Sequence, residues 1–177
     1  MKLCLFALPL LLLSPTVSAE VRQVTPQGFE VAQSVDIAAS AARAFAGLSR
    51  IGRWWNPEHT YSGDGKNLRL DLTPGGCFCE TLPEGGWVRH MDVVAVWPGK
   101  MIRLRGALGP LQGEGVEGSL TWTIKPAGEN ATVTQNYVVG GFIRDGAGKW
   151  APLVDGVLND QLARFKSFVE TGSPVPR

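Results

Sequence analysis

The spacing of apolar residues changes near residue 150, and this change defines the class of fold. From this point apolar residues recur at steps of three and four, the period of an amphipathic helix, until Gly172 ends the pattern. Earlier segments alternate with period two between turn signals, which is typical of half-buried strands. We therefore expect an α+β fold in which the helix lays one face on an antiparallel sheet. The apolar positions of the helix are Trp150, Leu153, Val154, Val157, Leu158, Leu162, Phe165, Phe168 and Val169.

The rest of the chain reads as one domain of about seven strands. Its 177 residues allow a single core, and its 22 glycines and 12 prolines supply frequent turns. Two short helices are expected after the first strand: Ser40 caps one that runs to about Arg50, and a second turn carries Trp54 and Trp55 and stops before Asn56-Pro57. The predicted strands are 28–37, 67–72, 77–82, 87–97, 100–108, 119–125 and 131–139.

Residues 1–19 have the three parts of a secretory signal peptide. Lys2 precedes an apolar stretch at 3–13, and small residues end the segment at Ala19. The stretch is shorter than the roughly 20 apolar residues that a membrane span needs. We expect cleavage after Ala19, a secreted or periplasmic protein, and no stable membrane anchor. The remaining chain divides into a lead at 20–27, a domain at 28–171 and a tail at 172–177.

Charge excludes two kinds of partner. Cleavage removes one lysine and no acid, which leaves 16 basic against 16 acidic residues. The arginines at 43, 50 and 53 are too few and too dispersed to follow a phosphate backbone. Neither nucleic acid nor an anionic membrane is an expected partner.

No metal and no cofactor are expected. The stretch Gly113 to Gly118 spells a dinucleotide-binding motif, but a strand follows it where a helix is needed, so we interpret it as a loop. After cleavage only Cys77 and Cys79 remain. They allow a local disulfide, half of a metal site or a plain pair of small buried side chains. We expect the plain pair, because cysteine is often buried and no further cysteine completes a zinc site.

Four short strings resemble turns of the SRPBCC superfamily, also called START-like or Bet v-like. They are Asp36-Ile-Ala-Ala-Ser40, Trp54-Trp-Asn-Pro57, Thr73-Pro-Gly-Gly76 and Val96-Trp-Pro-Gly-Lys100. Their order extends the resemblance over roughly residues 28 to 170, and the polyketide cyclase and heat-shock ATPase-activator branch is the most similar. The resemblance implies a helix-grip fold, in which a curved sheet wraps the C-terminal helix around an apolar cavity. Its members bind sterols, lipids or polyketide-like molecules, and some are cyclases.

The leading hypothesis is therefore an exported protein that binds a hydrophobic or amphipathic small molecule between sheet and helix. Gln135 and Tyr137 share the apolar phase of their strand and could orient a ligand, since polar groups are costly to bury unpaired. Gly156, in the middle of the helix, either leaves space for a ligand or allows close packing. The expected ligand contacts are Phe29, Val31, Trp54, Trp55, Leu70, Trp122, Gln135, Tyr137, Val154, Leu158 and Leu162.

Two other functions stay open. The first is a cyclase-type or hydrolase-type enzyme, in which His90 and Asp92 point the same way on one strand as an acid–base pair, or Tyr137 transfers the proton. Glu80 and Glu114 are further candidates. Of the two interpretations of His90 and Asp92, a surface ion pair is the one we expect. The second is a protein-interaction module with a filled core, using an exposed half of the Trp54 and Trp55 pair.

Overall fold

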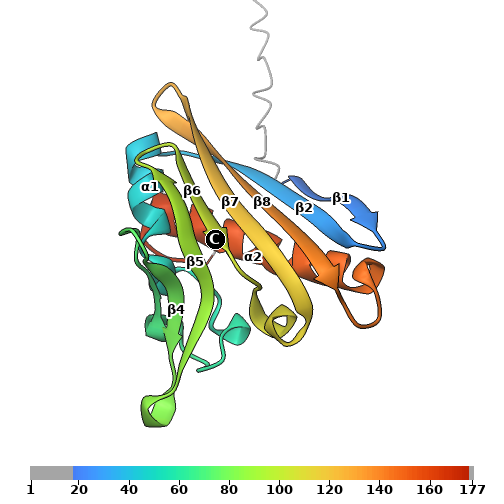
Figure 1. The fold of residues 1–177 in the computed structure, drawn as a ribbon. Helices are drawn as coiled ribbons and strands as arrows, with labels where there is room; N and C mark the ends of the chain where they lie inside the picture. The colour runs from blue at the N-terminus through green and yellow to red at the C-terminus, as the bar shows by residue number, and fades with distance from the viewer. Residues whose placement is uncertain (1–17, 176–177) are drawn as a thin grey trace, which may run out of the picture.

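A single antiparallel sheet of eight strands forms one layer of the molecule. The computed structural model describes residues 18–175, so the signal predicted at 1–19 lies almost entirely outside the described residues. The strand order is β1-β2-β8-β7-β6-β5-β4-β3, and every neighbouring pair is antiparallel (Figure 1). The strands are β1 (Ser18–Thr25), β2 (Gly28–Ile37), β3 (Leu68–Leu70), β4 (Cys77–Thr81), β5 (Trp87–Trp97), β6 (Met101–Arg105), β7 (Gly115–Ala127) and β8 (Asn130–Phe142).

The second layer is the long helix α2 (Ala147–Thr171), which crosses behind the sheet (Figure 1). Its buried residues Leu158, Leu162 and Phe165 belong to one hydrophobic cluster with the inward residues of β7 and β8, such as Trp122. Gly172 ends the helix in the left-handed conformation, and its N–H donates to the Phe168 carbonyl over 2.8 Å. The predicted α+β architecture and its C-terminal helix are confirmed.

The connection between β2 and β3 contains one α-helix and several single turns. In α1 (Ala41–Leu48) the Ser40 hydroxyl accepts from the Arg43 N–H over 3.3 Å, as expected of an N-cap. The expected second helix is instead built from the 3-10 turns η1 (Ile51–Arg53) and η2 (Pro57–His59), followed by η3 (Gly65–Asn67). Pro57 restricts Asn56 to an extended conformation, which prevents a continuous helix.

Two elements go beyond the sequence prediction. Residues 20–25, expected in a lead outside the domain, belong to β1 and pair with β2. A register shift between Val21 and Gln23 interrupts the alternation of this edge strand, so the sequence shows no strand period there. The β7 and β8 hairpin is also longer than expected and is paired from Gly115 to Ala127, so the loop predicted at 113–118 is mostly strand.

Two further 3-10 turns complete the chain: η4 (Pro83–Gly85) between β4 and β5, and η5 (Gly109–Gly113) between β6 and β7. Among residues 18–175 no helix has the length and apolar character needed to cross a bilayer.

Candidate ligand cavity

A cavity of about 400 Å³ lies between the first half of α2, the turn η5 and the inner faces of β4 and β5. This volume lies in the range of small-molecule sites. Its apolar wall comes from α2 on one side, where a helical spacing of three and four turns large side chains to one face. The apolar lining is Trp55, Phe78, Leu108, Pro110, Leu111, Trp150, Leu153, Val154, Val157 and Leu158.

The polar wall of the cavity is formed by His90 and the segment Glu58 to Tyr61. Hydrogen bonds from α2 and η5 fix this segment. The Gln161 side chain accepts from the Asn56 N–H over 2.7 Å and contacts His59 Nδ1 at 2.8 Å. The Tyr61 hydroxyl donates to the Gly109 carbonyl over 2.9 Å. The polar groups therefore gather at one side of a mostly apolar space, which suits an amphipathic molecule.

A β-bulge in β5 directs His90 toward the cavity. In the pairing with β4, Phe78 lies opposite Met91 and Cys79 lies opposite Arg89, which leaves His90 as the extra residue. His90 and Met91 are consequently both buried, while Arg89 and Asp92 are both exposed. The His90 ring packs against the rings of Phe78 and Tyr61, with centroid distances of 4.6 and 5.9 Å.

Glu80 on β4 is the polar partner of His90. Glu80 Oε2 lies 3.0 Å from His90 Nε2, and the side chains are only 0% and 5% exposed. The same carboxylate accepts from the N–H groups of Ser62 and Tyr61 over 2.6 and 3.2 Å. Burial by itself would raise the pKa of Glu80, but these hydrogen bonds outweigh burial and keep the pKa below its usual value. Glu80 is therefore a carboxylate at neutral pH.

Burial lowers the pKa of His90, against the opposing effect of Glu80. His90 is thus neutral near pH 7. An ionised carboxylate can only accept, so His90 Nε2 carries the proton and Nδ1 has a free lone pair.

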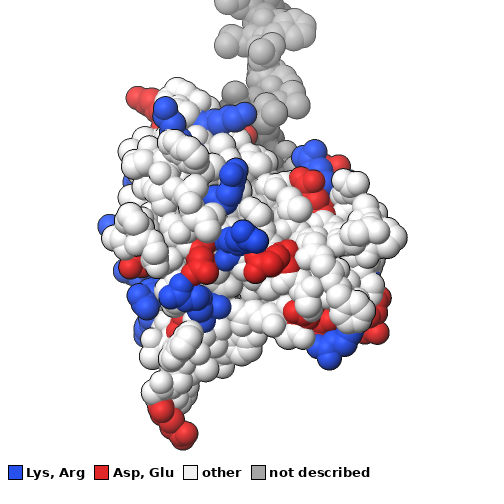
Figure 2. Space-filling view, in the orientation of Figure 1, with Lys and Arg blue, Asp and Glu red and all other residues white. Residues whose placement is uncertain are grey.

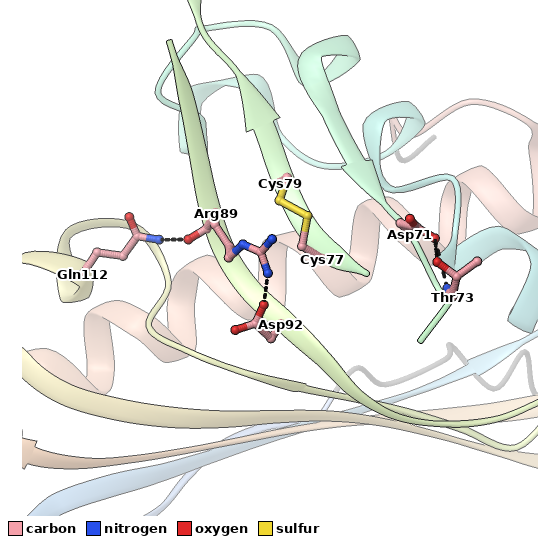
Figure 3. Close-up of a disulfide and its surroundings, with 7 residues drawn as sticks. All are labelled: Asp71, Thr73, Cys77, Cys79, Arg89, Asp92 and Gln112. Atoms are coloured by element: carbon pink, nitrogen blue, oxygen red, sulfur yellow. Dashed lines mark hydrogen bonds and ion pairs between the residues drawn. A yellow bond between two sulfur atoms is a disulfide. The ribbon is translucent and has the colours of Figure 1, made fainter. Parts of the chain in front are cut away.

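The predicted pair of His90 and Asp92 is wrong. Strand alternation would place both on one face, but the bulge shifts the phase and leaves Asp92 on the opposite face, where it forms an ion pair with Arg89 (Figure 3). Glu114 also lies outside the cavity lining and binds the exposed Arg144, whose N–H donates to it over 2.8 Å. Of the acid–base candidates, only His90 and Glu80 come together.

Three of the predicted ligand contacts line the cavity: Trp55, Val154 and Leu158. Trp54 instead packs in the core, with Nε1 donating to the Gly47 carbonyl over 3.1 Å and its ring 5.1 Å from that of Phe165. Because Trp54 and Trp55 are both buried, the pair has no exposed half for the interaction-module hypothesis. The remaining apolar candidates that fill the core are Phe29, Val31, Leu70, Trp122 and Leu162.

Gln135 and Tyr137 also serve the core. Gln135 accepts from Trp122 Nε1 over 2.7 Å and donates to Gln33 and to the Leu158 carbonyl, each over 3.1 Å. The Tyr137 hydroxyl accepts from the Leu108 N–H over 3.1 Å, and burial raises its pKa to about 12. Their polar atoms are satisfied within the protein and do not line the cavity.

The cysteines differ from the expectation as well. Cys77 and Cys79 form a disulfide with their Cα atoms 5.5 Å apart, so the expected plain pair is wrong (Figure 3). Both side chains lie on one side of β4, as the strand alternation requires, beside the Arg89 and Asp92 pair (Figure 3). The intervening Phe78 points the other way and lines the cavity.

The exposed face of the sheet that Figure 2 shows has no large patch of purely basic or purely acidic side chains. Basic and acidic side chains are interspersed across the view in Figure 2. Arg105 on β6, for example, lies 3.0 Å from Glu117 on β7. In the part of the chain that the structure describes, no three His, Cys, Asp or Glu side chains come together as a metal ion would require.

A sheet that wraps one long helix around an apolar cavity of ligand size defines the class of helix-grip proteins. Residues 28–170 match the family model described as polyketide cyclase / dehydrase and lipid transport, so the chain belongs to this family and the SRPBCC resemblance is confirmed. No curated protein matches the sequence.

Solved structures share the fold at low sequence identity. A conserved protein of unknown function from Enterococcus faecalis, EF2215, superposes with a TM-score of 0.62 and 14% identity over 92% of this chain and 80% of that one. CalU16 from Micromonospora echinospora has a TM-score of 0.57 and 13% identity, over 93% of this chain and 88% of CalU16. DynU16, a protein in the dynemicin biosynthetic locus, has a TM-score of 0.56 and 20% identity, over 82% of this chain and 48% of DynU16. These similarities establish the fold only.

Proposed function

We propose that this protein binds an uncharged apolar or amphipathic small molecule in the cavity beside α2. The observation that carries the proposal is the lining, which is apolar on the α2 and η5 walls and polar only at His90 and 58–61. The membership in a cyclase and lipid-transport family supports the same class of ligand. The cavity also argues against the alternative of a filled core.

The charges at the polar wall favour an uncharged ligand. Glu58 lines the cavity and Glu80 lies directly behind His90, whereas none of the lining residues is lysine or arginine. An anionic head group would meet two carboxylates and no cation, which disfavours its binding. The ligand class we expect carries hydroxyl or carbonyl groups at its polar end.

Binding can be tested with the uncharged fluorescent dye N-phenylnaphthylamine. Replacing Val154 and Val157 together by tryptophan fills the α2 wall, and we expect the dye to bind about tenfold more weakly, a loss of about 1.4 kcal/mol. The matched control is Val21→Trp with Val24→Trp, since both valines are exposed on β1. Equal dye affinity in the two double variants would contradict the proposal.

We also propose that the protein is exported and that cleavage after Ala19 leaves a mature chain that begins at Glu20. The signal-like sequence of 1–19 and the Cys77 to Cys79 disulfide support this, because disulfides persist in oxidising compartments. Mass spectrometry of the intact protein from the exported fraction should give the mass of residues 20–177. Recovery of the full-length mass only from the cytosol would contradict export.

A further inference from the structure

We infer that His90 is a general base that removes a weakly acidic C–H proton from an uncharged ligand in the cavity, with Glu80 as its positioning residue. The inference rests on the proposed binding function and adds an activity to it. Its basis is the environment of the two nitrogens of one buried ring.

The two nitrogens of His90 face different surroundings. Nε2 is held by Glu80 Oε2 over 3.0 Å. Nδ1 makes no hydrogen bond to any residue in 18–175, yet the only fully buried side-chain polar atom without a partner in that range is Asn159 Oδ1. Nδ1 is therefore not sealed in the core, and the ring lines the cavity. Its free lone pair is open to a ligand there.

The surroundings fix the ring and tune it for proton transfer. Phe78 and Tyr61 pack against the ring, and the bulge in β5 sets its direction. When Nδ1 takes a proton, the Glu80 carboxylate stabilises the resulting imidazolium without being protonated, the role that a buried carboxylate has behind a catalytic histidine. Two backbone N–H groups keep Glu80 ionised and in place.

Among the other titratable groups near the ring, the Tyr61 hydroxyl and His59 Nδ1 are already hydrogen-bonded. Tyr61 uses its hydroxyl to donate to Gly109, and burial beside Glu80 raises its pKa. His59 Nδ1 is occupied by Gln161 at 2.8 Å. Glu58 lines the polar wall, and the Arg89 and Asp92 pair on β5 faces the other side of the sheet (Figure 3).

Nitrobenzisoxazole is a suitable probe because it is small, uncharged and apolar and needs only a base. His90 Nδ1 takes the ring C–H proton, the electron pair of that bond forms the nitrile, and the N–O bond breaks to leave a coloured phenolate. The proton then passes from Nδ1 to water, so no cofactor or oxidant is required. We expect catalysed release of the phenolate by the wild-type protein, and about a hundredfold lower rate constant in His90→Phe.

Two variants, Glu80→Gln and Asp92→Asn, test whether the carboxylate bonded to His90 is the one that acts on it, or whether any carboxylate nearby on the sheet would have the same effect. Glu80→Gln should lower the rate and move the midpoint of the pH–rate profile to lower pH, because the imidazolium loses its carboxylate. Asp92→Asn should keep the wild-type rate and profile, since Asp92 lies on the opposite face. An unchanged profile in Glu80→Gln, or a loss of rate in Asp92→Asn, would overturn the assignment.

Two measurements on the wild-type protein need no variant to fold. Imidazole NMR with isotope-labelled histidine should show neutral His90 with the proton on Nε2 at pH 7, and a proton on Nδ1 would overturn the inference. Dye binding is measured on the same sample. Dye binding without phenolate release rejects the general base alone, whereas absence of dye binding rejects the proposed binding function itself.

Discussion

Glu80 and His90 lie on adjacent strands, and Glu80 Oε2 is 3.0 Å from His90 Nε2. The histidine ring lines the cavity and the carboxylate lies behind it. The contact exists because β5 has one residue more than β4 at this point. A regular strand would place His90 and Asp92 on the same face. Because of the one inserted residue, His90 pairs with the buried Glu80 and not with the exposed Asp92. The insertion also places a titratable group in an apolar site.

The stability of the fold should fall with acidification, in two steps that reflect this pair. The folded-state pKa of His90 lies below its usual value of 6.5, so the unfolded chain binds more protons just below that pH and the free energy of unfolding decreases there. The folded-state pKa of Glu80 is also lowered, so its stabilisation is present above the unfolded value and is lost as the pH falls through the folded one.

Urea unfolding between pH 8 and 4 measures this dependence. In His90→Phe the step just below pH 6.5 should disappear, because the group that titrates differently in the two states is gone. His59→Phe is the control and should keep that step. A wild-type free energy of unfolding that rises as the pH drops below 6.5 would contradict the assignment of a buried neutral His90.

Gln135 should be a stability residue and not a ligand contact. Gln135→Leu removes the acceptor of Trp122 Nε1, the donor to Gln33 Oε1 and the side-chain donor to the Leu158 carbonyl. We expect a loss of about 3 kcal/mol in the free energy of unfolding from these buried unpaired groups. Binding of N-phenylnaphthylamine by the folded variant should be unchanged. Gln23→Leu, on the exposed edge strand, is the matched control and should change stability by less than about 0.5 kcal/mol.

Much of the fold could be predicted because it depends on local periodicity. The bounds of β2 and β5 and the cap at Ser40 follow from alternation and from a side chain that can accept a backbone N–H. β1 has no strand signal in the sequence because its alternation is broken after Val21 and because both of its valines are partly exposed. An edge strand with weak burial has little hydrophobic signal.

The site was harder to predict because it depends on contacts between distant segments. The apolar phase of a strand does not distinguish residues that fill a core from residues that line a cavity, so it predicts ligand contacts at Phe29 and Trp122, which fill the core. Leu108 ends a predicted strand and Pro110 lies in η5, and no sequence period indicates that either lines a cavity. Phe78 and Tyr61 could have been found only by knowing that His90 is the bulged residue.

The disulfide should add little stability. Only one residue separates Cys77 from Cys79, so the bridge restricts the unfolded chain only slightly. We expect the double variant Cys77→Ala with Cys79→Ala to lose about 1.5 kcal/mol by chemical denaturation. Reductant should destabilise the wild-type protein by a similar amount and leave the double variant unaffected. A loss above about 4 kcal/mol would show that the disulfide stabilises the fold by more than the restriction of the unfolded chain explains.

Two glycines should respond in opposite directions to alanine. At Gly118 on β7 an added Cβ would lie 2.5 Å from Tyr137 Cε2 and 2.6 Å from the Gly106 carbonyl oxygen. Neither neighbour moves easily, because the Tyr137 hydroxyl is held by the Leu108 N–H. Gly118→Ala should therefore cost about 2 kcal/mol or more in the free energy of unfolding, as overpacked cores do.

Gly156 on α2 is the matched case. It is exposed and nothing lies within 4 Å of an added Cβ, so the expected close packing is wrong, and Gly156 does not line the cavity. Gly156→Ala should stabilise the helix by about 1 kcal/mol, because alanine loses less backbone entropy on folding. Thermal unfolding of the two variants beside the wild type measures both effects. If Gly156→Ala lowered the melting temperature, the surface that α2 presents at this position would be in contact with another part of the protein.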